Sequence, residues 1–163
     1  MTWSAILGLR RLGSIAIVAL VCYLITSALI GPAKQVEVQN DRSARDYIGR
    51  AVPSFLTYWD FDAFESRAAG ELKASRDFEL IRHTFARGKK KLGKPISYGP
   101  IVGQVNDSFA TDYSGEIISA VYTQKVSFKY EEAAIIMSLV RREGGWKFQK
   151  LAVRAPSIID FNE

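Results

Sequence analysis

The feature that most constrains this chain is a change in the spacing of its apolar residues near residue 90. Between residues 43 and 87 they recur at steps of three and four, the spacing of one helix face. From residue 95 onward apolar and polar residues alternate, which is typical of strands that bury one face. Helices followed by such strands predict an α+β fold, in which three helices pack on a curved, mainly antiparallel, four-stranded sheet.

The first expected helix begins near residue 43 and carries one apolar stripe. Either Asp41 or Ser43 can cap its start. Pro53 falls on the opposite side of the helical wheel, so a kink or a break is expected there. The stripe consists of Ala44, Tyr47, Ile48, Ala51, Val52, Phe55, Leu56 and Trp59.

Two shorter helices are expected to follow. Asp60 or Asp62 can cap the second, and Gly70 is expected to end it. Ser75 is the expected cap of the third helix, and Gly88 its expected stop. The expected inward residues are Phe61, Phe64 and Ala68 in the second helix, and Phe78, Ile81 and Phe85 in the third.

Four strands account for the rest of the chain, at residues 95–105, 115–130, 133–142 and 146–154. The second strand has the clearest alternation. Its expected core face is made of Ile118, Ala120, Tyr122, Val126, Phe128 and Tyr130. The third strand is apolar on both faces, which predicts a central position in the sheet.

The last strand changes phase in its middle. Trp146 and Phe148 share one phase, while Leu151 and Val153 share the other. A β-bulge between these pairs, near Gln149 and Lys150, would place all four apolar side chains on the core side. Such a bulge, together with the glycines of the first strand, would curve the sheet.

The N-terminal part of the chain has no charged residue between Arg11 and Lys34. A helix of that length spans the hydrocarbon layer of a bilayer, which is about 30 Å thick. This predicts a transmembrane anchor at 12–33, a short cytoplasmic N-terminus at 1–11 and a linker at 34–42, then the domain at 43–156 and a tail at 157–163. A cleaved signal peptide, and less favourably a buried core helix, are the alternatives. The positive charges before the segment favour an extracytoplasmic domain.

Composition excludes several classes of site. The formal net charge is +5, and Arg10 and Arg11 supply two of those charges, so the domain is too mildly basic to suggest nucleic-acid binding. Cys22 and His83 are the only residues of their types, which leaves no disulfide within the domain and no cysteine–histidine zinc set. We therefore expect no cofactor and no metal.

The order of these elements resembles the nuclear transport factor 2-like superfamily, a cone of curved sheet and helices. The segments that carry the resemblance are AVPSFLTYWDFDAFESRAA, FARGKKKLG and VRREGGWKFQKLAV, within residues 43–154. The resemblance implies either an enzyme or a binding domain, because the superfamily contains both. With the expected anchor, the layout is similar to the single-span scaffold subunits of type IV secretion channels.

Aromatic side chains are the first candidates for a ligand site within such a cone. Those that could line a pocket are Tyr58, Tyr98, Tyr113, Tyr122 and Trp146. Enzymes of the superfamily often pair a cone tyrosine with an acid, but the strand that carries Tyr122 offers only Glu116, at its start. We expect ordinary packing for these tyrosines. His83 lies off the apolar stripe of its helix, and helix capping accounts for Asp60 and Asp62.

A basic segment is the second candidate site. Its cations are Arg82, Arg87, Lys89, Lys90, Lys91 and Lys94. Clustered positive charge of this kind can bind anionic lipid headgroups or an acidic partner. The alternative is a solvated helix end, where cations also complement the helix dipole.

Together these features predict a non-catalytic, membrane-anchored, extracytoplasmic binding or scaffold domain, part of an envelope or secretion-type assembly. The expected partners are the membrane, through the N-terminal helix, and other envelope proteins or further copies of this chain. A small-molecule or lipid-binding domain, or an enzyme, using the cone pocket is the main alternative. A third is a cytoplasm-facing domain whose basic segment contacts the inner leaflet.

Overall fold

The computed structural model of the chain describes residues 35–112, 115–142 and 145–159. The chain divides into two compact units, Met1–Gln39 and Asn40–Glu163, and the sheet and its covering helices belong to the second. Within the described ranges no helix combines the length and the apolar character needed to cross a membrane. The predicted anchor, at 12–33, lies outside these ranges.

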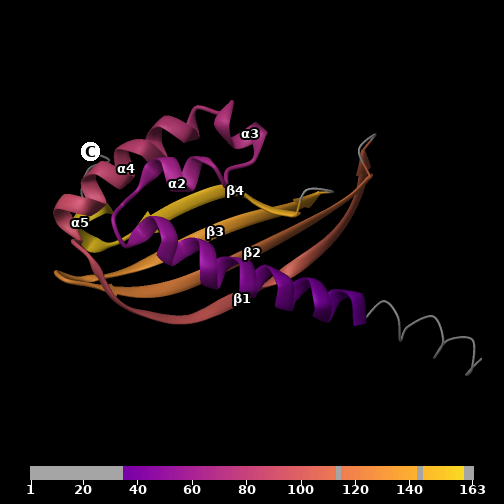
Figure 1. Cartoon of the computed structure of the whole chain (residues 1–163), viewed down its shortest axis with the longest axis horizontal. Coiled ribbons are helices and arrows are strands. Elements are labelled where there is room, and N and C mark those ends of the chain that lie inside the picture. Colours follow the sequence, from indigo (N-terminus) through magenta and orange to yellow (C-terminus); the bar gives the residue numbers. More distant parts are fainter. Residues whose placement is uncertain (1–34, 113–114, 143–144, 160–163) are drawn as a thin grey trace, which may run out of the picture. The chain divides into compact units, whose positions relative to one another are not determined.

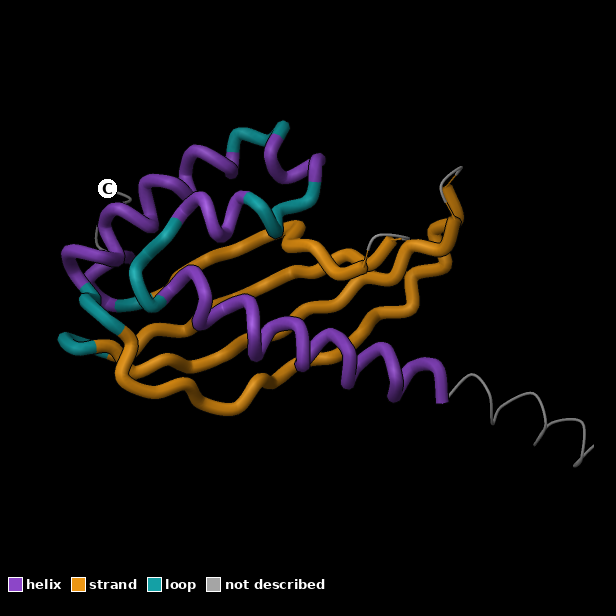
Figure 2. The backbone as a smooth tube through the Cα atoms, in the orientation of Figure 1, coloured by secondary structure: helices purple, strands orange, loops and turns teal. Residues whose placement is uncertain are grey.

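A four-stranded antiparallel sheet forms the base of the second unit, with the strand order β1-β2-β3-β4. Each strand pairs with the next one along the chain, and helices lie over one face of the sheet (Figures 1 and 2). The predicted α+β class with an antiparallel sheet of four strands is therefore confirmed. The strands are β1 (Pro95–Asp112), β2 (Gly115–Phe128), β3 (Glu132–Arg142) and β4 (Gly145–Arg154).

The core face of β2 follows the predicted alternation with two differences. Ile118, Ala120, Tyr122, Val126 and Phe128 are buried, as expected. Tyr130 was expected beside them but is 62% exposed, because β2 ends at Phe128 and Tyr130 lies in the following turn. Gln124 is buried on the same face, and its amide nitrogen donates to the carbonyl oxygen of Gly99 at 2.8 Å.

The predicted bulge in β4 is confirmed. Lys150 pairs with Ser138 and Phe148 pairs with Leu139, so Gln149 is an extra residue on the β4 side. Because of this extra residue, the phase of β4 shifts by one position. The four apolar side chains that are consequently buried on the helix-covered face are Trp146, Phe148, Leu151 and Val153.

The N-terminal helix covers residues 35–56 and begins earlier than predicted. Neither Asp41 nor Ser43 caps it, and residues 35–42 of the predicted linker are helical. Asn40 explains the difference: it is buried on the same helix face as Ala44, but its polar side chain interrupts the apolar pattern in the sequence. The helix also continues through Pro53 and ends at residue 56, so the expected break is absent.

The remaining helices are α2 (Phe61–Glu65), α3 (Gly70–Lys73), α4 (Asp77–Lys91) and α5 (Pro156–Ile159). Asp60 caps α2 as predicted, by accepting a hydrogen bond from the amide of Ala63 at 3.0 Å. Gly70 was expected to end the second helix, but it begins α3. Ser75 does not cap α4, and α4 runs three residues past Gly88.

Gly88 is needed for packing and not for ending the helix. A Cβ atom at this position would lie 2.2 Å from two ring carbons of Trp59, so only glycine lets the indole ring approach α4 this closely. The same ring stacks on Phe128 of β2, at 5.4 Å between centroids. Its Nε1 donates to the carbonyl oxygen of Gly93 at 2.8 Å. Trp59 thus joins the helix end to α4 and to β2.

Trp59 also ends the N-terminal helix in an unusual way. Its φ is 54°, in the left-handed region where glycine is the usual residue. The amide of Asp60 donates to the carbonyl of Phe55 at 2.8 Å, and that of Trp59 donates to the carbonyl of Leu56 at 3.3 Å. This is the hydrogen-bond pattern of a Schellman motif, with tryptophan in place of glycine. Burial of the indole offsets the backbone cost.

Interlocked aromatic rings fill the space between the helices and the sheet. Phe55 contacts the rings of Phe64, Phe85 and Phe148 at centroid distances of 5.5 to 5.7 Å. Phe64 in turn contacts Phe78 and Phe148. Each such pair adds about 0.5–1.5 kcal/mol beyond the burial of its area.

Both edges of the sheet are covered at their middle. On the β1 edge, Arg45 of the N-terminal helix donates to the carbonyl oxygens of Ile101 and Gly103. On the β4 edge, the amide of Phe148 donates to the carbonyl oxygen of Arg67 at 2.9 Å. The carbonyl oxygen of Phe148 accepts from the amide of Ala69 at 2.8 Å. These contacts occupy edge groups that could otherwise pair with another chain.

Candidate functional site

An acid does meet Tyr122, and it comes from the N-terminal helix. The Tyr122 hydroxyl donates to Asp41 Oδ1 at 2.7 Å, and Arg45 Nε donates to Asp41 Oδ2 at the same distance. The Arg45 guanidinium also lies over the Tyr122 ring, 5.1 Å from its centroid. We call these three residues the Asp41 cluster.

The charges within the Asp41 cluster favour one protonation state. The hydrogen bond from Arg45 lowers the pKa of the Asp41 carboxyl, and the bond from Tyr122 lowers it further. Burial raises the pKa of Tyr122, and the adjacent carboxylate raises it further. Asp41 is therefore an ionised acceptor and Tyr122 a neutral donor.

This arrangement suits a structural role better than acid–base chemistry. Tyr122 has no exposed surface, and both carboxylate oxygens of Asp41 already accept a hydrogen bond. Sequence reasoning missed Asp41 because it lies 81 residues from Tyr122 and was assigned to a linker. Local patterns carry no signal for such a pair.

The other aromatic candidates are held in separate contacts of their own. Trp146 is buried, and its indole donates to Ser43 Oγ at 2.9 Å. Tyr98 is half-buried, and burial raises the pKa of its hydroxyl. The side chain of Tyr113 lies outside the described residues. Trp146 therefore closes the core next to the N-terminal helix.

Tyr58 lies elsewhere, in a half-open surface pocket of about 400 Å³. Its lining residues are Thr57, Tyr58, Trp59, Lys89, Gly93 and Lys94, and we call it the lysine–tyrosine pocket. Three segments build it: the Schellman turn, the last turns of α4, and the residues that lead into β1. Tyr58 is 67% exposed, and Lys94 Nζ lies 5.6 Å from its ring centroid.

A second lysine–tyrosine pair adjoins this pocket. Lys129 Nζ lies 4.9 Å from the ring centroid of Tyr130, in the turn between β2 and β3. The amide of Tyr130 donates to the carbonyl of Leu92, and the amide of Lys129 donates to that of Lys94. Sequence reasoning missed this turn because no local pattern joins residues 129–130 to 92–94.

The predicted basic segment is divided along α4. All six of its cations are exposed, but only Lys89 and Lys94 line the lysine–tyrosine pocket. Arg82 lies further along α4, where it pairs with Glu79 at 3.6 Å and lies over the ring of Phe61. The part of the segment that lines the pocket is thus Lys89, in the last turn of α4, and Lys94, just beyond that helix.

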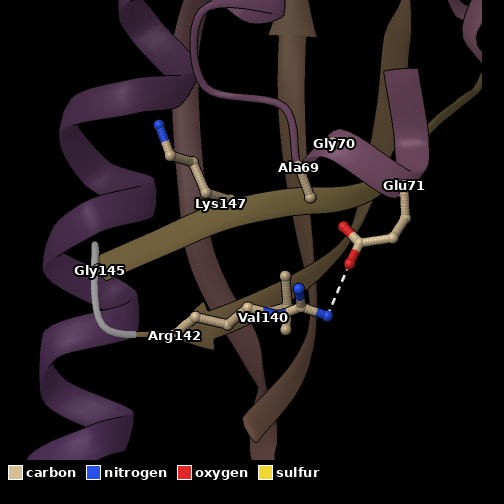
Figure 3. A pocket seen from close by; sticks show the side chains of 7 residues that line it. All are labelled: Ala69, Gly70, Glu71, Val140, Arg142, Gly145 and Lys147. Carbon is tan, nitrogen blue, oxygen red and sulfur yellow. Dashed lines mark ion pairs between the residues drawn. The ribbon is translucent and has the colours of Figure 1, made fainter. Parts of the chain in front are cut away.

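A smaller pocket of about 220 Å³ lies between α3 and the hairpin of β3 and β4 (Figure 3). Across it, Arg142 and Glu71 form an ion pair at 2.6 Å, with the two side chains facing each other (Figure 3). This pair joins α3 to the end of β3. Because the charges of Arg142 and Glu71 neutralise each other, Lys147 supplies the remaining charge among the residues that line this pocket.

The remaining candidates have simple positions. His83 is exposed on α4, and Asp62 is exposed in the first turn of α2. No group of three or more histidine, cysteine or acidic side chains suited to a metal ion occurs among the described residues.

Comparisons of this chain with protein-family models, curated proteins and solved structures find no match. The site must therefore be interpreted from its own geometry and chemistry.

Proposed function

We propose that this chain is a non-catalytic binding or scaffold protein, anchored in a membrane by residues 12–33, with a nuclear transport factor 2-like domain outside the cytoplasm. The observation that carries the proposal is the aromatic packing between the helices and the sheet. The rings of Phe55, Phe64, Phe85 and Phe148 pack against one another there. Packing of this kind favours recognition at the surface over catalysis in the interior.

The anchor gives such a domain a physical advantage. A domain held at the membrane has a high effective concentration near other proteins of the same envelope. Modest contact surfaces are then sufficient for stable assembly. The mildly basic composition agrees with a role in protein assembly.

The test is mild crosslinking of the full chain in its own membrane, followed by identification of the copurified molecules. A defined complex with reproducible stoichiometry supports the proposal. A protein that is recovered alone, or with a bound lipid or metabolite, would overturn it.

One observation favours the alternative, a ligand-binding or enzymatic cone, namely the pairing of Tyr122 with Asp41. The variant Tyr122→Phe separates the two functions because it removes only the hydroxyl group. Under our proposal the crosslinked complex is recovered unchanged, with a modest loss of stability. Loss of a bound small molecule in this variant would favour the cone.

A further inference from the structure

We infer that the lysine–tyrosine pocket binds an acidic peptide segment of a partner protein. This inference rests on the proposed binding function and assigns it to one site. Two tyrosines at or beside this pocket, Tyr58 and Tyr130, are exposed.

The Schellman turn separates two neighbouring aromatic residues. Because Trp59 takes a left-handed backbone conformation, its ring turns into the core while Tyr58 remains 67% exposed. Left-handed conformations at residues other than glycine cost free energy and often occur at functional sites. Here the conformation presents a tyrosine at the mouth of a pocket.

The charged residues that line this pocket are both lysines. Lys89 and Lys94 line the pocket, and Lys129 lies over the adjacent ring of Tyr130. Gly93 connects the two pairs: its carbonyl accepts from Trp59, and a Cβ atom there would lie 3.1 Å from the Tyr130 ring. Asp60 and Glu131, the acids nearest in sequence to these tyrosines, are engaged in capping α2 and in bonding Ser157.

The helix dipole argues against a small free anion as the occupant. Lys89 lies at the C-terminal end of α4, where the backbone carbonyls repel a compact negative charge. A peptide avoids this difficulty, since its carboxylates can contact the lysine ammonium groups at the rim. Its apolar or aromatic side chains can then lie against Tyr58 and Trp59.

The shape of the pocket favours a protein over a lipid surface as the occupant. The pocket is a half-open hollow of about 400 Å³, which suits a protruding peptide better than a flat headgroup surface.

The experiment measures binding of fluorescein-labelled ten-residue peptides to the full chain in neutral detergent micelles. The probe alternates glutamate and tyrosine, and the matched peptide carries glutamine at each glutamate. We expect saturable binding of the glutamate peptide and no saturable binding of the glutamine peptide. The double variant Lys89→Gln/Lys94→Gln should weaken it about tenfold, since each exposed ion pair contributes a factor of a few.

Control variants make the result specific to the pocket. Lys125→Gln/Lys150→Gln removes the same charge from exposed positions on β2 and β4 and should leave affinity nearly unchanged. Tyr58→Ser should weaken binding about threefold through loss of the exposed ring. All variants should keep the wild-type unfolding midpoint, because these side chains are exposed.

Three outcomes of the peptide experiment would overturn the inference. They are absence of saturable binding, equal affinity for the glutamine peptide, and equal loss in both double lysine variants. Binding restricted to vesicles of phosphatidylserine and phosphatidylcholine would also overturn it and indicate a lipid surface. If crosslinking still recovers the same complex from Lys89→Gln/Lys94→Gln, the binding function stands and another surface carries it.

Discussion

At a few positions of this fold, the surrounding atoms restrict which residue can be present. Gly88 lies inside α4 with the indole of Trp59 directly against its α-carbon. Gly49 also lies inside a helix, but nothing approaches the place where its Cβ atom would be. The two helical glycines therefore differ in their surroundings: a side chain at position 88 would clash with Trp59, whereas one at position 49 would meet no other atom.

We predict that Gly88→Ala destabilises the domain by about 1–3 kcal/mol, because the added methyl group overpacks the Trp59 ring. Gly49→Ala should stabilise it by about 0.5–1 kcal/mol, since alanine restricts the unfolded backbone and favours the helix. Midpoints of denaturant unfolding for the two variants measure both effects. If both variants shifted the unfolding midpoint equally and in the same direction, the Trp59 ring would not restrict the side chain at position 88.

The Asp41 cluster predicts a dependence of stability on acid. Because the pKa of Asp41 is lower in the folded chain than in the unfolded chain, its contribution is fully present above an unfolded pKa of about 4. That contribution is lost as the pH falls through the folded pKa. Stability of Asp41→Asn should therefore fall less steeply below about pH 5 than that of the wild type.

Urea unfolding at a series of acidic pH values measures this slope. Asp46→Asn provides the control, because Asp46 is an exposed aspartate on the same helix. The control should follow the wild-type profile. An unchanged slope in Asp41→Asn would show that Arg45 and Tyr122 do not bind the carboxylate in solution.

At the scale of elements, the bulge in β4 determines which side chains of that strand face the core. Gln149 is the extra residue, and its removal would restore a regular alternation while leaving Phe148 opposite Leu139 and Lys150 opposite Ser138. Deletion of a single residue within a strand usually disrupts its pairing, but deletion of Gln149 would keep the apolar residues of β4 on the core face.

We predict that deletion of Gln149 leaves the domain folded, with a modest loss of stability from reduced twist. Deletion of Lys147 is the matched control, because it reverses the phase between Trp146 and Phe148. One of those rings must then leave the core, at a cost of about 3–5 kcal/mol. Circular dichroism and thermal unfolding distinguish the two variants. Equal damage from both deletions would contradict this account of the bulge.

The elements also show which patterns a sequence can reveal. Alternation on β2 and the phase change on β4 are local, so both were predicted correctly, apart from Tyr130 beyond the end of β2. Asn40 hid the start of the N-terminal helix because a buried polar residue breaks an apolar stripe. Gly70 and Gly88 were taken for helix ends, since the sequence does not show whether a glycine serves conformation or packing.

The candidate site was less accessible to sequence reasoning than the fold. Lys89 and Lys94 belong to a visible basic segment, and Tyr58 was already a candidate. Their meeting depends on the left-handed turn at Trp59, for which tryptophan gives no sequence signal. The Asp41–Tyr122 pair depends on tertiary packing across 81 residues, which no local period encodes.

For the whole molecule, the proposed membrane anchor leads to a test of topology. We predict that a reporter active only outside the cytoplasm works when it is fused after Glu163, because Arg10 and Arg11 precede the apolar segment. The same fusion to a chain in which acidic residues replace both arginines should lose much of that activity. A silent wild-type fusion would indicate a cytoplasm-facing domain.

The two hydrogen-bonded indoles have a practical consequence for such experiments. Trp146 donates to Ser43 in the first half of the N-terminal helix, and Trp59, just past the end of that helix, donates to Gly93. Once Trp3 is replaced, the chain contains one fluorophore at each of these places. A variant that retains only Trp146 would then report on the contact between β4 and the N-terminal helix at Ser43. A variant that retains only Trp59 would report on the lysine–tyrosine pocket. A peptide in that pocket should shift the emission of Trp59 and leave that of Trp146 constant.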